Sequence, residues 1–187
     1  FSGSAAEICK KIIDDRWNGT YFDGGESLFR DQFWVRDFSL HLRGIIALGR
    51  LDKVRSNLAW AMKVYSENGS IGTTILGGDT VVDLWHYSAD SLPLLLYALK
   101  ISGSKDLAGV YTDFLNQEIR RYFEKLFDSE TSQVRKEFFS TPKDVVMRKG
   151  TCVANAFMVF TQKLLINDFP NLENPFGSRD LRSAFLD

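Results

Sequence analysis

Apolar residues recur at helical spacing in six segments of this 187-residue chain. The segments cover about residues 5–16, 37–48, 51–66, 90–101, 105–127 and 152–166. The first segment begins with a capping box, in which Ser4 precedes Glu7 by three residues. Elsewhere only residues 80–84 resemble a short strand. The pattern therefore predicts an all-α protein.

The helical segments differ in how much charge they carry. The second, fourth and sixth are nearly uncharged, with Arg43, Lys100 and Lys163 as their only interior charged residues. The first, third and fifth are amphipathic. A helix that is apolar on nearly all sides is buried, and an amphipathic helix covers it from outside. We therefore expect three inner helices and three outer ones.

The connections between these helices alternate in length. A few residues join the second helix to the third and the fourth to the fifth, whereas about twenty residues precede each inner helix. If the hairpins repeat around an axis, the long loops gather at one end, where a site is expected. We therefore expect an (α/α) toroid with about three helical hairpins, in which residues 1–187 form a single helical domain. A regular solenoid is not expected, because the sequence shows no self-similarity at the usual repeat periods.

The composition excludes several classes of function. The chain has 23 Lys and Arg against 24 Asp and Glu, and no basic run that would bind nucleic acid or an anionic membrane. No apolar stretch approaches the roughly 20 residues of a membrane span. We therefore expect a cytoplasmic protein without nucleic-acid or membrane partners. Cys9 and Cys152 are expected to be buried free thiols, and no metal site or cofactor is predicted.

The first long loop ends in aromatic and charged residues that suit a sugar. Trp34, Arg36 and Asp37 stand at the start of an inner helix. Charged donors and acceptors fix sugar hydroxyls, and a Trp face packs on the apolar face of a sugar ring. The alternative is structural: Asp37 caps the helix and Arg36 pairs with it at the surface.

The other two long loops end in a similar way. The second contains Trp85 and Tyr87 before Asp90, although helix capping alone would explain Asp90. The third contains Asp144 next to apolar residues, which could keep its carboxyl group protonated as a general acid. Pairing of Asp144 with Lys143 or Arg148 would have the opposite effect on its pKa.

Together these loop ends resemble a known family of enzymes. Trp34-Val35-Arg36-Asp37, the stretch from Tyr87 to Leu94, and Asp144 followed by Arg148, Gly150, Val153, Asn155 and Ala156 are similar to motifs of the six-hairpin α/α-toroid glycoside hydrolases. That clan holds glucoamylases, trehalases and the glucosidase domain of glycogen debranching enzymes.

The resemblance implies an inverting glycosidase that acts on α-linked glucosides or short oligosaccharides. It implies that Asp144 is the general acid and that eight residues bind the substrate. These are Trp34, Arg36, Asp37, Trp85, Tyr87, Asp90, Arg148 and Asn155. The family's general base lies in a later hairpin, for which this chain offers no counterpart. We therefore expect the N-terminal half of a barrel, which self-associates or pairs with a C-terminal half through the exposed flanks of its inner helices.

Three alternatives stay open at this point. The chain could be a non-catalytic carbohydrate-binding or regulatory half-barrel. It could be a toroid that binds a polyprenyl diphosphate, but the metal-binding residues of that class have no good counterpart here. A plain helical scaffold would leave the three clusters of polar and aromatic residues unexplained.

Overall fold

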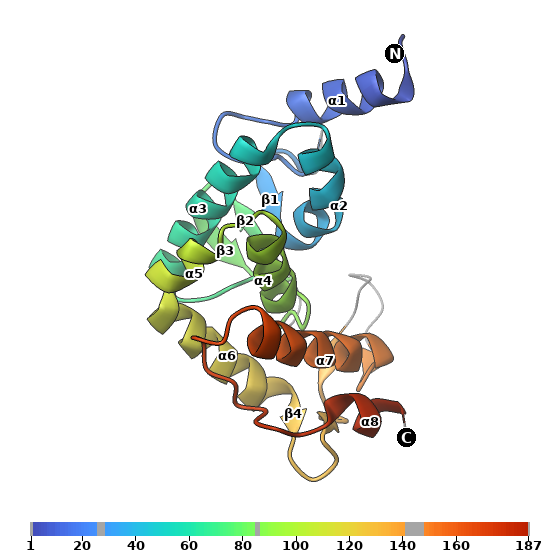
Figure 1. Ribbon diagram of the computed structural model, residues 1–187, viewed down its shortest axis with the longest axis vertical. Coiled ribbons are helices and arrows are strands. Elements are labelled where there is room, and N and C mark those ends of the chain that lie inside the picture. Colours follow the sequence, from blue (N-terminus) through green and yellow to red (C-terminus); the bar gives the residue numbers. More distant parts are fainter. Residues whose placement is uncertain (1, 26–28, 85–86, 141–147, 187) are drawn as a thin grey trace.

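The computed structural model describes residues 2–25, 29–84, 87–140 and 148–186 (Figure 1). The side chains of residues 139, 140, 148, 185 and 186 are not part of this description. Asp144 and Trp85, two of the predicted site residues, lie outside the described residues.

The six predicted helical segments are helical in the structure. The helices are α1 (Ala5–Asp15), α2 (Val35–Ala47), α3 (Leu51–Asn68), α4 (Ser91–Ile101), α5 (Lys105–Val110), α6 (Thr112–Leu126), α7 (Cys152–Asn167) and α8 (Leu181–Leu186). The capping box at Ser4 and Glu7 is confirmed. The segment predicted as one helix over 105–127 is broken at Tyr111 into α5 and α6, and α8 was not predicted.

The prediction of an all-α toroid is wrong, because the long loops contain strands. The strands are β1 (Gln32–Trp34), β2 (Thr74–Leu76), β3 (Thr80–Val82), β4 (Phe127–Asp128), β5 (Gln133–Val134), β6 (Phe139–Ser140) and β7 (Arg148–Lys149). Among the described residues they form one three-stranded sheet, β1-β2-β3, and two pairs, β4-β5 and β6-β7, all antiparallel. The chain is therefore a mixed structure in which helices are joined by small sheets.

The three-stranded sheet connects two of the long loops. Strand β2 turns into β3 through Gly77 and Gly78, both with positive φ, which glycine adopts without a steric penalty. On its other side β2 pairs with β1, which leads directly into α2. The sheet thereby places the start of α2 against a segment about forty residues later in the chain.

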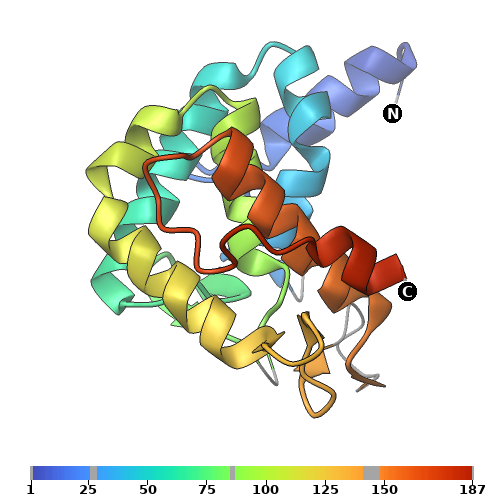
Figure 2. The same ribbon diagram turned by 60° about the horizontal axis from the view of Figure 1, so that its bottom comes forward.

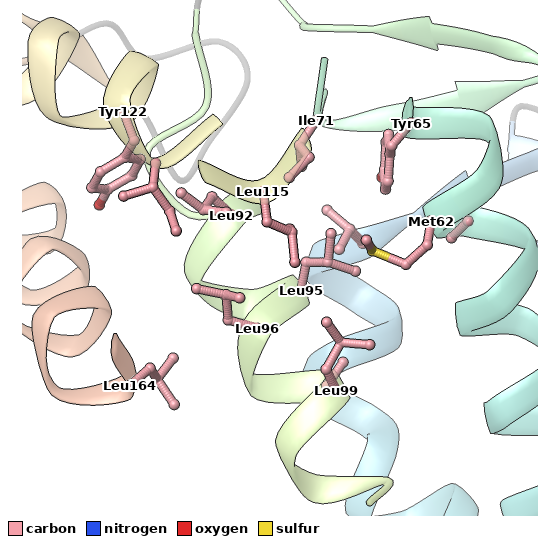
Figure 3. Packing of buried hydrophobic residues seen from close by; sticks show 14 of the residues in the cluster. Met62, Tyr65, Ile71, Leu92, Leu95, Leu96, Leu99, Leu115, Tyr122 and Leu164 are labelled. Atoms are coloured by element: carbon pink, nitrogen blue, oxygen red, sulfur yellow. The ribbon is translucent and has the colours of Figure 1, made fainter. Parts of the chain in front are cut away.

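Helix α4 is the centre of the core. It packs against α2 on one side and α7 on the other (Figures 1 and 2). Figure 3 shows Leu92, Leu95, Leu96 and Leu99 of α4 among side chains of α3, α6 and α7. These four leucines are at most 2% exposed. Burying each side chain contributes roughly 1.5–3 kcal/mol to stability.

The prediction of inner helices is therefore confirmed for α4 but only in part for α2 and α7. Leu40 on α2 is 65% exposed, and Val153 and Ile166 on α7 are 39% and 53% exposed. One flank of each of these helices is open to solvent. No helix in the described part of the chain is both long and apolar enough to cross a membrane.

The three inner helices run parallel to one another. Arg36 at the start of α2 contacts Asp90 at the start of α4, and seven residues further along each helix Arg43 contacts Tyr97. The ring of Tyr97 lies 5.9 Å from that of Phe160 in the middle of α7, and Lys100 near the end of α4 pairs with Asp168, which directly follows α7. The N-termini of α2, α4 and α7 therefore lie at the same end of the molecule, as the loop lengths predicted.

Candidate functional site

Two of the predicted sugar-binding residues meet where α2 and α4 begin. The Nε atom of Arg36 donates a hydrogen bond to Oδ2 of Asp90, and the two side chains are 21% and 10% exposed. Arg36 therefore binds a residue 54 positions later, instead of pairing with its neighbour Asp37 at the surface. A charge-assisted hydrogen bond between side chains that are largely shielded from solvent is both strong and well oriented.

Asp90 occupies the N-cap position of α4, but its side chain makes no capping hydrogen bond. Its other oxygen, Oδ1, accepts a hydrogen bond from the hydroxyl of Ser88. Capping alone therefore does not explain this aspartate. An ionised carboxylate has about four lone-pair sites, so these two bonds leave acceptor capacity on Asp90.

Two hydroxyl groups near this pair are buried without a partner among the described residues. Ser39 lies one helical turn after Arg36, and Ser91 directly follows Asp90. Both residues are 1% exposed, and neither Oγ atom has a hydrogen-bond partner in the described part of the chain. A buried hydroxyl without a partner costs stability. The α2–α4 junction is thus not optimised for stability alone.

Tyr87, three residues before Asp90, lies against α6. Its ring centroid is 6.5 Å from that of Tyr122, whose hydroxyl donates to the carbonyl oxygen of Ala89 at 3.1 Å. The Nζ atom of Lys125 lies 5.4 Å from the centre of the Tyr87 ring. Burial raises the pKa of Tyr87 well above its ordinary value, so the phenol is neutral at pH 7. Helix α6 thereby holds the segment between Tyr87 and Asp90 in place.

Asp83 directly follows the end of β3 and was not among the predicted site residues. Thr73 Oγ1 donates a hydrogen bond to Asp83 Oδ1 at 3.3 Å. Asp83 is exposed to solvent, yet the protein around its carboxyl group raises the pKa by desolvation. The available signal was its position, an acidic residue directly after the β-branched run Thr80–Val82.

Trp34 and Asp37 line a different place, a largely apolar cavity of about 720 Å³ between α1 and α2. The indole Nε1 of Trp34 donates to Gln32 Oε1 at 3.0 Å, and Phe29 packs edge-on against its ring. Asp37 is exposed in the first turn of α2 and does not cap that helix. The hydrogen bonds of the structure thus join Arg36 to Asp90, while Trp34 and Asp37 face α1.

The residues predicted from the third loop, Asn155 and Arg148, show no contact that indicates a binding site. Asn155 is 6% exposed. Its Oδ1 accepts from the backbone N–H of Val134 at 2.9 Å, and its Nδ2 donates to the carbonyl oxygen of Thr151 at 3.2 Å. These bonds attach β5 to the start of α7, so Asn155 has a structural role there. The backbone of Arg148 belongs to β7, but its side chain is outside the description.

The described residues contain no group of three or more His, Cys, Asp or Glu side chains that could hold a metal ion. Cys9 and Cys152 are free, but both are exposed, so the expectation of buried thiols is wrong. Cys152 lies in the first turn of α7 and Cys9 faces the α1–α2 cavity. Neither thiol lies among the residues that surround Arg36 and Asp90.

No protein-family model, no curated protein and no solved structure matches this chain. The functional inference therefore rests on the sequence motifs and on the contacts of the described residues.

Proposed function

We propose that this chain binds an α-linked glucoside at the junction of α2 and α4 and contributes to its hydrolysis with inversion at the anomeric carbon. The observation that carries the proposal is the ion pair between Arg36 and Asp90. It joins two sequence motifs that resemble those of sugar-binding loops in one hydrogen-bonded unit. A cytoplasmic location is part of the proposal.

The chemistry of the pair suits a polyol. The carboxylate of Asp90 accepts hydrogen bonds and is held in one orientation by Arg36 and Ser88. A sugar ring presents hydroxyl groups in fixed directions, so an acceptor with a fixed orientation binds it with little loss of entropy. Tyr87, three residues before Asp90, adds an aromatic ring that lies against Tyr122. These features support binding of the non-reducing sugar of a short oligosaccharide or a small glycoside.

The proposed reaction needs a general acid, which the sequence assigns to Asp144. The acid donates its proton to the glycosidic oxygen as the bond to the anomeric carbon breaks, and water attacks that carbon from the opposite face. The segment that contains Asp144 leads into β7 and α7, and α7 begins at the same end of the molecule as α2 and α4. Asp144 itself lies outside the described residues, so its assignment as the acid is supported by the sequence resemblance.

Two substitutions in the full-length protein test the proposal, with hydrolysis of 4-nitrophenyl α-glucoside and calorimetric binding of maltose as the measurements. Asp144→Asn should lower kcat by about 10²–10⁴-fold while maltose still binds. Asp90→Asn should weaken maltose binding roughly tenfold or more, because it removes a charged acceptor. Asp79→Asn is the matched control, an exposed aspartate in the β2–β3 turn.

Each result decides between the functions considered. A normal rate in Asp144→Asn contradicts the acid, and unchanged maltose affinity in Asp90→Asn contradicts the clamp. If the wild-type protein binds maltose but hydrolyses no α-glucoside, the chain is a carbohydrate-binding module. If it neither binds nor hydrolyses these sugars, both functions are wrong.

A further inference from the structure

The chain contains two Asn-Gly pairs, Asn18-Gly19 and Asn68-Gly69. The side-chain amide of an asparagine can be attacked by the backbone nitrogen of the next residue, and glycine has no side chain to shield that nitrogen. Both asparagines are exposed to solvent. The two pairs therefore have the same intrinsic chemistry and similar access to water, so only their hydrogen bonds can make them differ.

The fold occupies both reacting groups of the second pair. Asn68 is the last residue of α3. Its Nδ2 donates to the carbonyl oxygens of Val64 at 2.9 Å and Asp79 at 2.8 Å. Its Oδ1 accepts from the backbone N–H of Val81 at 3.4 Å, and the N–H of Gly69 donates to the last turn of α3. A reaction between this amide and the Gly69 nitrogen would have to break these bonds.

The first pair lies in an exposed turn after α1, and its reacting groups are free. Neither Nδ2 of Asn18 nor the backbone N–H of Gly19 has a hydrogen-bond partner in the described part of the chain. A Cβ atom added at Gly19 would meet nothing within 4 Å, so the turn is open on that side. The nitrogen that would attack and the nitrogen that would leave are therefore both available.

The same turn also activates the amide carbonyl of Asn18. Its Oδ1 accepts hydrogen bonds from the backbone N–H groups of Thr20 and Tyr21, both at 2.9 Å. Negative charge develops on this oxygen when a nitrogen adds to Cγ, and fixed N–H donors stabilise such charge. The hydrogen bonds of the first pair thus favour the reaction that those of the second pair oppose.

We propose that Asn18 is a modification site at which the protein deamidates spontaneously, whereas Asn68 stays intact. The Gly19 nitrogen forms a bond to Asn18 Cγ, the bond from Cγ to Nδ2 breaks, and the proton of the Gly19 N–H leaves with Nδ2 as ammonia. Water then opens the resulting succinimide ring at one of its two carbonyl carbons. The products are aspartate and isoaspartate, and water is the only co-reactant.

The modified turn is the segment that attaches α1 to the core. Trp17 and Phe22 on either side of the turn form a β-bridge, and their rings lie 5.0 Å apart. The N–H of Phe22 donates to Oδ1 of the buried Asn57 at 2.9 Å. Both products add a negative charge between Trp17 and Phe22, and isoaspartate also adds a methylene group to the main chain there. Because α1 has no buried residue of its own, the modification alters a main support of this helix.

Peptide mass spectrometry of the full-length protein tests the proposal after incubation at mildly alkaline pH. Trypsin gives the peptides 17–30 and 64–100, each with one asparagine and no glutamine, so a deamidated peptide identifies its site. Asn18 should react about 10–10³-fold faster than Asn68, because reaction at Asn68 requires the loss of its side-chain hydrogen bonds. In urea the two sites should react at similar rates. Asn18→Gln is the matched control, whose longer side chain cannot form the five-membered ring, and its peptide 17–30 should stay unmodified.

The expected result is conversion of peptide 17–30 into two products, the aspartate and isoaspartate forms, while peptide 64–100 keeps its asparagine. Equal rates at Asn18 and Asn68 in the folded protein would overturn the proposal. It is also wrong if both sites react in urea but neither reacts in the folded protein. Modification of peptide 17–30 in Asn18→Gln would show that another group reacts, which contradicts the assignment to Asn18.

Discussion

The two ends of α4 differ in how their polar side chains are used. At the N-terminal end the polar side chains hydrogen-bond to one another, whereas at the C-terminal end they hydrogen-bond to the backbone of the helix terminus. Asp90 binds Arg36 and Ser88 and leaves the first N–H groups of α4 without a side-chain cap. At the other end the hydroxyl of Ser102 donates to the carbonyl oxygen of Ala98 at 2.8 Å, and Arg55 donates to the carbonyl oxygen of Ser102 at 3.1 Å. The second arrangement satisfies the helix terminus in the usual way, and the first does not.

The carboxylates beside the two ends also differ. Desolvation raises the pKa of Asp83 near the N-terminal end, whereas Lys100 and Lys105 lower the pKa of Asp168 near the C-terminal end. Ionisation of Asp168 stabilises the fold, and ionisation of Asp83 does not. Groups that reduce stability where they stand are typical of functional sites. The contrast therefore supports the proposed site at the N-terminal end of α4.

The largest effect is expected from breaking the ion pair on one side only. Arg36→Met leaves the carboxylate of Asp90 nearly buried without its cation, which should lower the free energy of unfolding by about 2–3 kcal/mol. The double variant Arg36→Met/Asp90→Asn removes both charges and should recover most of this loss. Urea denaturation followed by circular dichroism measures both values. Equal losses in the single and double variants would show that the pair itself stabilises the fold, and the contrast between the two ends would fail.

A smaller and pH-dependent effect is expected at the C-terminal end. The pKa of Asp168 is lowered in the folded protein, so its contribution is present above the unfolded value of about 3.9 and is lost as the pH falls through the folded pKa. Asp168→Asn should therefore cost about 1 kcal/mol at pH 7, since both lysines are 40% or more exposed. At pH values below the lowered folded pKa of Asp168 the variant and the wild type should converge.

Asp83→Asn is the control for this pH dependence, because the sign is reversed. Its folded pKa is raised, so wild-type stability should fall as the pH rises from about 3.9 through the folded pKa, and the variant should lack this fall. Thermal unfolding between pH 3 and 7 compares the two variants. A stability loss in Asp83→Asn at pH 7 as large as that in Asp168→Asn would remove the distinction between the ends.

The sequence was sufficient for the helices but not for the sheets. Helical periodicity extends over ten or more residues and is local, as is the capping box at Ser4. The strands have two or three residues, too few for an alternating pattern, and β1 pairs with β2 about forty residues away. The β2–β3 hairpin had two local signals, the glycine pair at 77–78 and the run at 80–84, whose prediction as a short strand is confirmed by β3.

The candidate site could likewise be predicted only in part, because its residues are local in sequence but their contacts are not. Local motifs pointed to Arg36 and Asp90 separately, but their contact spans 54 positions and depends on the parallel packing of α2 and α4. The role of Asn155 in holding β5 could not be foreseen, because β5 itself was not predicted. Asp83 was overlooked because its hydrogen bond with Thr73, ten positions earlier, is visible only in the folded loop.

The finest test compares two buried serines of the same helix. Ser102 is 2% exposed and hydrogen-bonded, so Ser102→Ala should cost about 1 kcal/mol. Ser91 is 1% exposed and has no partner among the described residues, so Ser91→Ala should change stability by less than about 0.3 kcal/mol or increase it slightly. Urea denaturation of the two variants side by side measures the difference.

If Ser91→Ala costs as much as Ser102→Ala, its hydroxyl has a structural partner, and the N-terminal end of α4 is built for stability as well. If Ser91→Ala is neutral for stability yet weakens maltose binding, the hydroxyl is a binding group of the proposed site.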